Sequence, residues 1–210
     1  MCCPVDGDFG RLKQSLENRG LSCDCILCRA ENKYGKTRSS LMFEVTSFLE
    51  SHPVKQITAP AVNYAIPADL VEEAENFEKS LKETYPARLF ATYDGASNKI
   101  NGMLPTMGMA RIHEWLMIAY YRQPQRALGY AAKMLTDHGY RVTIKAANGI
   151  LTLSGTNCIL STKAVRAIQY IELVCIRASN KPLAQAARVL AEEMYTTFMG
   201  SMAGYKDFEV

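Results

Sequence analysis

Apolar residues recur every three or four positions along most of the chain, which is the spacing of one face of an α-helix. The pattern predicts helices over residues 6–20, 37–51, 67–85, 106–122, 124–138, 161–178 and 182–199. Gly20, Gly139 and Gly200 stand at the ends of three of these segments, where glycine commonly ends a helix. The chain is therefore expected to be mainly α-helical.

The stretch after Pro67 has the clearest amphipathic pattern in the sequence. Its apolar side carries Leu70, Val71, Ala74, Phe77 and Leu81. The acidic residues, which we expect on the opposite and solvated side, are Glu72, Glu73, Glu75 and Glu78.

Two short segments break the helical pattern. Residues 140–145 and 150–154 alternate apolar and polar side chains, and Asn148-Gly149 lies between them. This arrangement predicts a small β-hairpin at about 140–154, because Asn-Gly favours a tight turn. The other helices occur in pairs of about the length found in helical-repeat proteins, so a repeat-like stack of helices is expected.

Composition narrows the class of protein without identifying it. A length of 210 residues fits one domain with a small appendage, and 48% apolar with 21% charged residues is typical of a globular chain. A net charge of +3 is too small to predict nucleic-acid binding, and no apolar run is long enough for a membrane span. Seven Cys without a secretion signal at the start favour a cytoplasmic or nuclear location.

The strongest local motif is a cluster of cysteines, followed by a polar break at 31–36 that we interpret as a connection. Cys23, Cys25 and Cys28 bring three sulfur atoms close together, and Zn²⁺ takes four such ligands in a tetrahedron. The fourth ligand is expected to be Cys3 or Cys2, carried back by the first helix. The alternative is a loop with free thiols.

The segment from Gly20 to Cys28 resembles the post-SET segment of SMYD-type SET-domain proteins, in particular fungal ones with TPR-like C-terminal helices. Residues 127–142 and 187–200 are similar to later helices of the same region. The resemblance implies a Cys knuckle that binds structural zinc and a TPR-like helical domain. It divides the chain into residues 1–32, a helix with the knuckle, and residues 33–210, the helical domain with the hairpin.

The catalytic SET core of that family has no counterpart in this sequence. The motifs that bind S-adenosylmethionine and build the lysine channel are missing, and Leu21 replaces the usual aromatic residue beside the Cys cluster. We therefore expect neither methyltransferase activity nor S-adenosylmethionine binding. Without the core, the inner face of the helices would be open to a small apolar molecule, a peptide or a second copy of the chain.

A second constellation centres on His113 in the predicted helix 106–122. The spacing of apolar residues turns His113 toward the core or a cleft, where it is either a structural histidine or a proton-transfer group. In the second case the protein would be a small-molecule enzyme that catalyses cyclisation, isomerisation or proton transfer. The residues expected to assist His113 are Glu114 or Asp94 as its orienting group, Arg111 as an anion or carbonyl contact, and Tyr120 or Tyr93 as a hydroxyl donor.

Methionine and aromatic side chains gather in the same part of the chain. Met107, Met109, Met117 and Trp115 are suited to line an apolar groove, because methionine adapts its shape to a ligand. The alternative is that they simply fill a helical core. The function favoured by the sequence is thus a helical binding protein with an apolar cleft, and the enzyme using His113 is the alternative.

Overall fold

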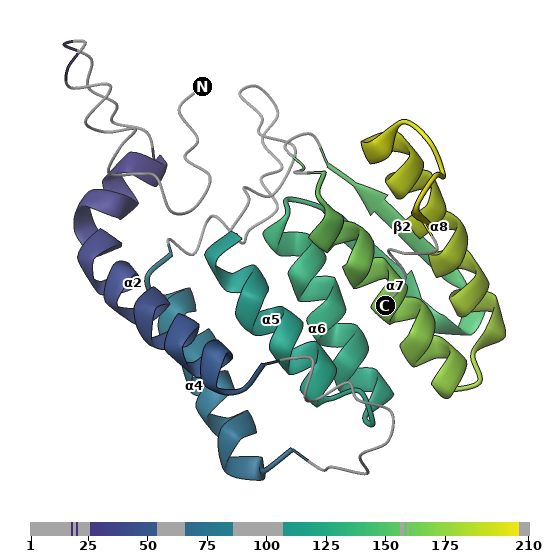
Figure 1. Ribbon diagram of the computed structural model, residues 1–210, viewed down its shortest axis with the longest axis horizontal. Helices are drawn as coiled ribbons and strands as arrows, with labels where there is room; N and C mark the ends of the chain where they lie inside the picture. Colours follow the sequence, from purple (N-terminus) through teal and green to yellow (C-terminus); the bar gives the residue numbers. More distant parts are fainter. Residues whose placement is uncertain are drawn as a thin grey trace.

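The computed structural model describes residues 26–53, 66–85, 107–155 and 160–205, together with residues 18, 20 and 158 (Figure 1). The side chains of residues 26–28, 30, 31 and 107 lie outside this description. The described residues form six helices and one two-stranded sheet. The prediction of a mainly helical fold with one small hairpin is therefore confirmed.

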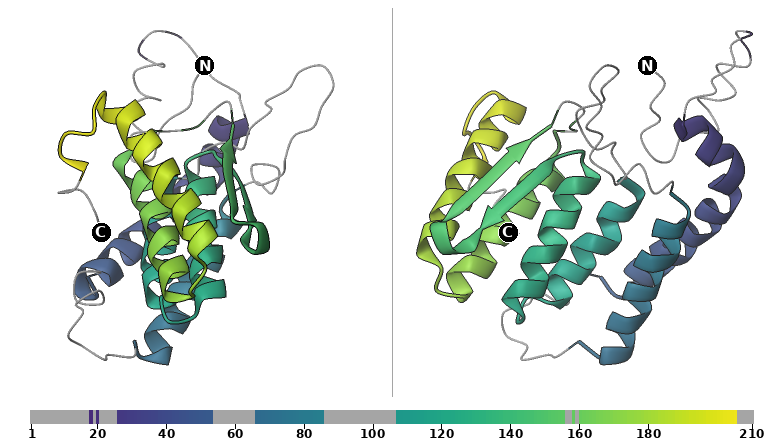
Figure 2. Two further views of the ribbon diagram at one scale, coloured as in Figure 1. Left: turned by 90° about the vertical axis from the view of Figure 1, so that its right-hand side faces the viewer. Right: turned by 180° about the vertical axis from the view of Figure 1, so that it is seen from behind.

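The helices form a stack in chain order. They are α2 (Ile26–Ser51), α4 (Ala68–Glu83), α5 (Met107–Ala119), α6 (Pro124–Asp137), α7 (Thr162–Arg177) and α8 (Lys181–Met199). Each described helix packs against the next one along the chain, as Figures 1 and 2 show. The expected helix over 6–20 lies outside the described residues, and the TPR-like character of the stack stays a prediction.

Helix α2 begins much earlier than the sequence pattern predicts. It starts at Ile26 instead of residue 37, so the polar segment 31–36 is helical and not a connection. Lys33 and Lys36 are exposed there, and an exposed turn needs no apolar face to continue a helix. The helix also runs across the division expected between residues 32 and 33.

The ends of the later helices follow ordinary capping chemistry. Ser161 accepts a hydrogen bond from the Ala164 backbone N–H at the start of α7, and Asn180 does the same for Leu183 at the start of α8. Gly200 ends α8 with a φ of 77°. These signals explain why the helices of this half lie within one or two residues of the predicted ranges.

The hairpin consists of β1 (Arg141–Lys145) and β2 (Ile150–Ser154), which pair antiparallel. It lies against α6 and α8 (Figure 2). The connecting turn is fixed to the start of α8, because the Asn180 side-chain N–H donates to the Ala146 carbonyl at 3.0 Å. Gly149 adopts a φ of 64° next to Pro182, and a Cβ at Gly149 would come within 2.5 Å of the Pro182 Cβ.

The hydrophobic core runs through the whole stack of described helices. Its fully buried large side chains include Trp115, Leu81, Ile112, Met134, Leu135, Ile168, Ile171 and Leu183. A ring cluster joins three helices at one end, since Phe48 of α2 lies 5.6 Å from Phe77 of α4 and 5.1 Å from Trp115 of α5 between ring centroids. None of the described helices is long and apolar enough to cross a membrane.

Candidate functional site

His113 lies on the inner side of α5, as the apolar spacing predicts. It is 3% exposed and shares this side of the helix with the buried residues Met109 and Leu116. Helix α5 packs between α4 and α6, so groups from both neighbours reach the imidazole ring.

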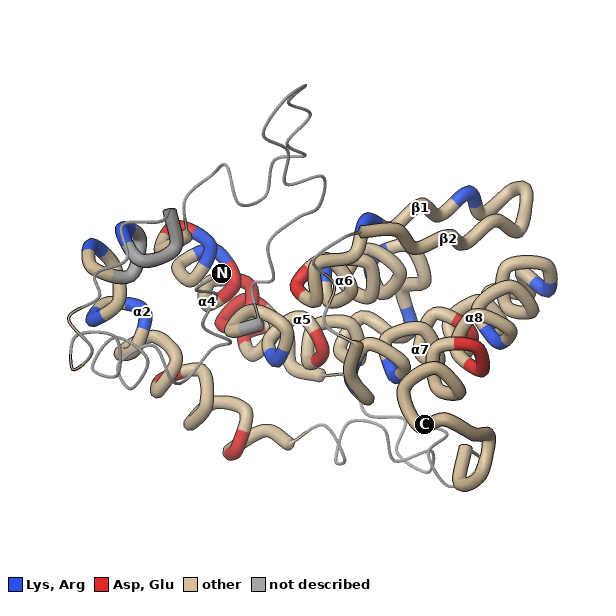
Figure 3. Tube along the Cα trace, turned by 90° about the horizontal axis from the view of Figure 1, so that it is seen from above, with Lys and Arg blue, Asp and Glu red and all other residues tan. Residues whose placement is uncertain are grey.

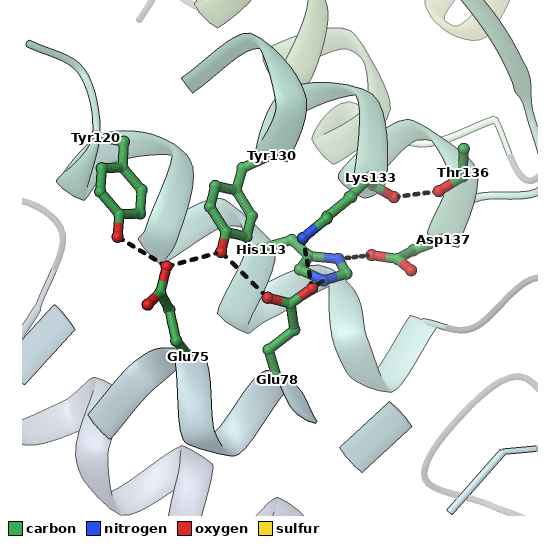
Figure 4. A network of polar contacts seen from close by, with 8 residues as sticks. All are labelled: Glu75, Glu78, His113, Tyr120, Tyr130, Lys133, Thr136 and Asp137. Carbon is green, nitrogen blue, oxygen red and sulfur yellow. Dashed lines mark hydrogen bonds and ion pairs between the residues drawn. The ribbon is translucent and has the colours of Figure 1, made fainter. Parts of the chain in front are cut away.

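Both ring nitrogens of His113 contact carboxylates (Figure 4). The Nδ1 atom lies 2.6 Å from Oδ2 of Asp137, at the end of α6, and the Nε2 atom lies 3.2 Å from Oε1 of Glu78 on α4. The side chain of Asp137 is 3% exposed and that of Glu78 is 14% exposed. One imidazole thus connects three helices through one buried and one partly buried contact with a carboxylate.

Further polar groups extend this network along α4. Glu78 also accepts hydrogen bonds from the Lys133 ammonium at 2.6 Å and from the Tyr130 hydroxyl at 3.1 Å. Glu75, one turn earlier, accepts from the hydroxyls of Tyr130 at 3.2 Å and Tyr120 at 2.7 Å. Figure 4 shows the carboxylates of α4 pointing toward groups of α5 and α6.

The charges of this cluster, which we call the His113 network, offset one another. Burial lowers the pKa of His113, but the hydrogen bonds and charges of Asp137 and Glu78 outweigh burial and raise the pKa above 6.5. Burial raises the pKa of Glu78, but His113 and Lys133 lower it to about 2. Burial and the neighbouring carboxylates raise the pKa of the Tyr130 hydroxyl above its usual range. The raised pKa of His113 and the lowered pKa of Glu78 both favour the charged pair, a protonated imidazole beside an ionised Glu78 carboxylate.

This geometry gives His113 a structural role in preference to a catalytic one. A general base needs a free lone pair beside a substrate, whereas both nitrogens of this imidazolium are bonded to carboxylates. The ring is also enclosed by the protein's own side chains. The network ties α4 to α5 and α6.

Two of the residues expected to assist His113 lie elsewhere. The Oε2 atom of Glu114 is 3.9 Å from the Lys163 ammonium on α7, and Arg111 donates to the Thr46 hydroxyl on α2 at 3.2 Å. Residues one and two positions from His113 project from other sides of the helix. Asp137 and Glu78 orient the ring, and Glu114 does not.

Of the two tyrosines and the aspartate expected at the site, the structure describes one tyrosine. Tyr120 joins the network, but its hydroxyl donates to Glu75 and receives a hydrogen bond from Arg126 at 2.7 Å. Tyr93 and Asp94 lie outside the described residues.

The described residues that were expected to line an apolar groove on α5 are buried in the hydrophobic core. Met109 is 2% exposed, Met117 1% and Trp115 0%, and the indole N–H of Trp115 donates to the His52 carbonyl at 3.0 Å. They fill the core, which was the alternative interpretation of this cluster. Met107 begins α5, but its side chain lies outside the described residues.

Sequence reasoning missed the two carboxylates that hold His113. Asp137 lies 24 residues away and Glu78 lies 35 residues away, so no local spacing links them to the ring. The amphipathic pattern placed Glu75 and Glu78 on a solvated face, and the structure corrects this, because both turn toward α5 and α6. One available signal was Asp137 itself, an acidic residue at a helix C-terminus, where a negative charge is unfavourable unless a cation compensates it.

A second feature lies on the other side of α4. Between α2 and α4 the described residues form an open groove of about 340 Å³. Its apolar lining comes from Leu41 and Phe77. Its acidic lining comes from Glu44, Asp69, Glu72 and Glu73. We call this hollow the α2–α4 groove, and Figure 3 shows acidic positions gathered along α4.

The two helices that form the groove run in opposite directions. Arg38 of α2 donates to the Thr84 hydroxyl just beyond α4 at 3.1 Å, and Phe48, ten residues later on α2, contacts Phe77. The contacts of α2 thus move toward the N-terminus of α4 as the residue number on α2 increases, so the two helices are antiparallel. The apolar side chain of Leu41 lies toward the C-terminal end of α4, whereas Asp69 lies in its first turn.

The expected zinc site falls outside what the structure describes. Cys3, Cys23 and Cys25 are not among the described residues, and Cys28 lies in α2 without a described side chain. Within the described part of the chain, no three His, Cys, Asp or Glu side chains are arranged to hold a metal ion. The Cys knuckle and its zinc stay predictions.

Comparison with known proteins adds no relative. No protein-family model matches the chain, and no curated protein or solved structure is significantly similar to it. The resemblance to the post-SET region of SMYD-type proteins therefore stays a prediction.

Proposed function

We propose that this chain is a non-catalytic helical binding protein that holds a positively charged ligand with an apolar group in the α2–α4 groove. The observation that carries the proposal is the lining of this groove, where two apolar side chains lie beside four carboxylates. Burial against an apolar surface contributes binding energy, and the carboxylates favour a ligand that carries a positive charge.

The rest of the site supports a binding role. The His113 network and the ring cluster of Phe48, Phe77 and Trp115 fix α4 and α2 on the stack from two sides. A groove with rigid walls needs little rearrangement when a ligand enters, which favours binding. The TPR-like stack belongs to the same proposal, because such stacks present binding surfaces between helices.

Nuclear magnetic resonance with a small probe tests this function. Phenethylamine combines an ammonium with a phenyl ring, and we expect millimolar binding that shifts backbone amides of residues 41–44 and 69–80. The neutral 2-phenylethanol should give smaller shifts at the same residues, and the anionic 3-phenylpropanoate none. Equal shifts with all three compounds, or shifts spread over the molecule, would contradict the proposal.

A further inference from the structure

We propose that the natural occupant of the α2–α4 groove is a segment of another protein that carries one apolar side chain and, farther along, a cluster of Lys or Arg. This inference rests on the proposed function, because it concerns the same groove. It adds the chemical class of the partner and the spacing of its recognised groups.

The groove has an apolar end and an acidic end. On α4 the apolar Phe77 is followed, toward the helix N-terminus, by Glu73 four residues away and Asp69 eight residues away. A rise of 1.5 Å per residue separates them along the axis by about 6 and 12 Å. A ligand that uses both ends must therefore carry positive charges roughly 6–12 Å from its apolar group, which is farther than a single small cation reaches.

The carboxylates of the groove differ from Glu78, because no described cation forms an ion pair with them. Among the described residues, no Lys, Arg or His nitrogen pairs with Glu44, Asp69, Glu72 or Glu73. The hydroxyl of Ser40 donates to Glu44 at 3.4 Å, and it is uncharged. Like charges three and four residues apart on a helix repel each other, so cations from a partner would remove this repulsion as well as add ion pairs. This charge complementarity points to a basic partner.

The contrast with the other side of the same helix supports this inference. Glu78 forms hydrogen bonds with three groups of the protein itself, which are the Lys133 ammonium, the His113 imidazole and the Tyr130 hydroxyl. Glu72 and Glu73 are exposed and have no such partner among the described groups. A segment of protein fits better than a metal ion, because the lining includes Leu41 and Phe77. The hydrocarbon side chains of leucine and phenylalanine have no atom that coordinates a metal.

Fluorescence anisotropy with synthetic peptides tests the inference. The probe is a fluorescein-labelled alanine-based peptide of about twenty residues, long enough to be helical, with one Leu and with Lys four, seven and eight residues after it. Two matched peptides replace the Lys residues with Glu or the Leu with Ser. We expect the Glu peptide to bind at least ~10-fold more weakly and the Ser peptide about 5-fold more weakly.

Two variants locate the binding on the groove. Replacing Glu72→Gln and Glu73→Gln together should weaken the Lys peptide about 3- to 10-fold at low salt and flatten its dependence on salt. The control, Glu192→Gln with Glu193→Gln on α8, removes the same charge away from the groove and should leave binding unchanged. Circular dichroism verifies that both variants are folded.

The outcomes separate this inference from the proposed function. If phenethylamine shifts the groove amides but the Lys peptide binds no better than the Glu peptide, the inference is overturned and the proposed function stands. If both pairs of variants weaken the Lys peptide equally, the attraction is that of the whole protein and the inference is again overturned. If neither phenethylamine nor the peptide binds, the proposed function fails as well.

Discussion

Replacing His113 with glutamine tests the structural role of the His113 network most directly. The imidazole is one of the partners of Asp137, at 2.6 Å, and that carboxylate is almost fully buried. Removing one member of a buried ion pair costs about 3–5 kcal/mol, because the remaining charge stays in the protein interior. Glu78 keeps Lys133 and Tyr130, and Asp137 keeps a further contact, so we expect a loss near the lower limit, about 3 kcal/mol.

The loss should depend on pH with a defined sign. The pKa of His113 is raised on folding, so its charge stabilises the fold fully below about pH 6.5 and less as the pH rises through the folded value. Glu78 has the opposite sign: its pKa falls from 4.5 to about 2, so its contribution is present above pH 4.5 and is lost as the pH falls toward 2. The difference between wild type and His113→Gln should be largest between about pH 4.5 and 6.5.

Urea unfolding followed by circular dichroism at pH 5.5, 7.5 and 9 measures this difference as a free energy of unfolding. His52→Gln is the matched control, because His52 is half-buried and the hydrogen-bond partner of its Nδ1 atom in the described part of the chain is the uncharged Phe48 carbonyl, at 3.0 Å. We expect the control to lose about 1 kcal/mol or less. A loss below ~1 kcal/mol for His113→Gln at pH 5.5, or a loss that stays constant up to pH 9, would refute the reasoning.

Three further predictions concern other parts of the chain. Gly149→Ala should lower the free energy of unfolding by about 2 kcal/mol through its left-handed backbone and the contact with Pro182, whereas Gly129→Ala, in an open position of α6, should raise it by about 0.5 kcal/mol; thermal unfolding compares the two, and equal effects would contradict this. Cys175 is 1% exposed and burial raises its pKa to about 11, so mass spectrometry should find it unmodified by iodoacetamide in the folded protein and modified in urea. Plasma mass spectrometry should find about one zinc per chain, reduced in Cys25→Ser; a metal-free wild type purified without chelators would exclude the knuckle.

Local signals predicted the second half of the fold well. The hairpin at 140–154 follows from alternation, and helices α7 and α8 follow from apolar periodicity and Gly200, all of which act within a few residues; the structure adds the caps at Ser161 and Asn180. Residues 31–36 of α2 were interpreted as a connection because this segment is polar, and Lys33 and Lys36 are exposed. Periodicity detects a buried face, and a helix that extends beyond its buried face gives no such signal.

The candidate site was harder to predict than the fold. The inward direction of His113 follows from the spacing of α5, but its partners come from other helices. Amphipathicity assigns every carboxylate of α4 to solvent, whereas the structure divides them between two sides of one helix. That division depends on where α2, α5 and α6 pack, which is a property of the tertiary structure and not of any one segment.

The position of α4 has a consequence for any molecule that binds this protein. One side of the helix is a wall of the hollow shared with α2, and the other is fastened through Glu78 to an ionisable ring. The contact between His113 and Glu78 thus helps to hold α4 in the position that forms the α2–α4 groove. Thermodynamic linkage between two sites is reciprocal. We therefore expect ligand binding in the α2–α4 groove and protonation of His113 to favour each other, because both depend on the same placement of α4 between α2 and α5.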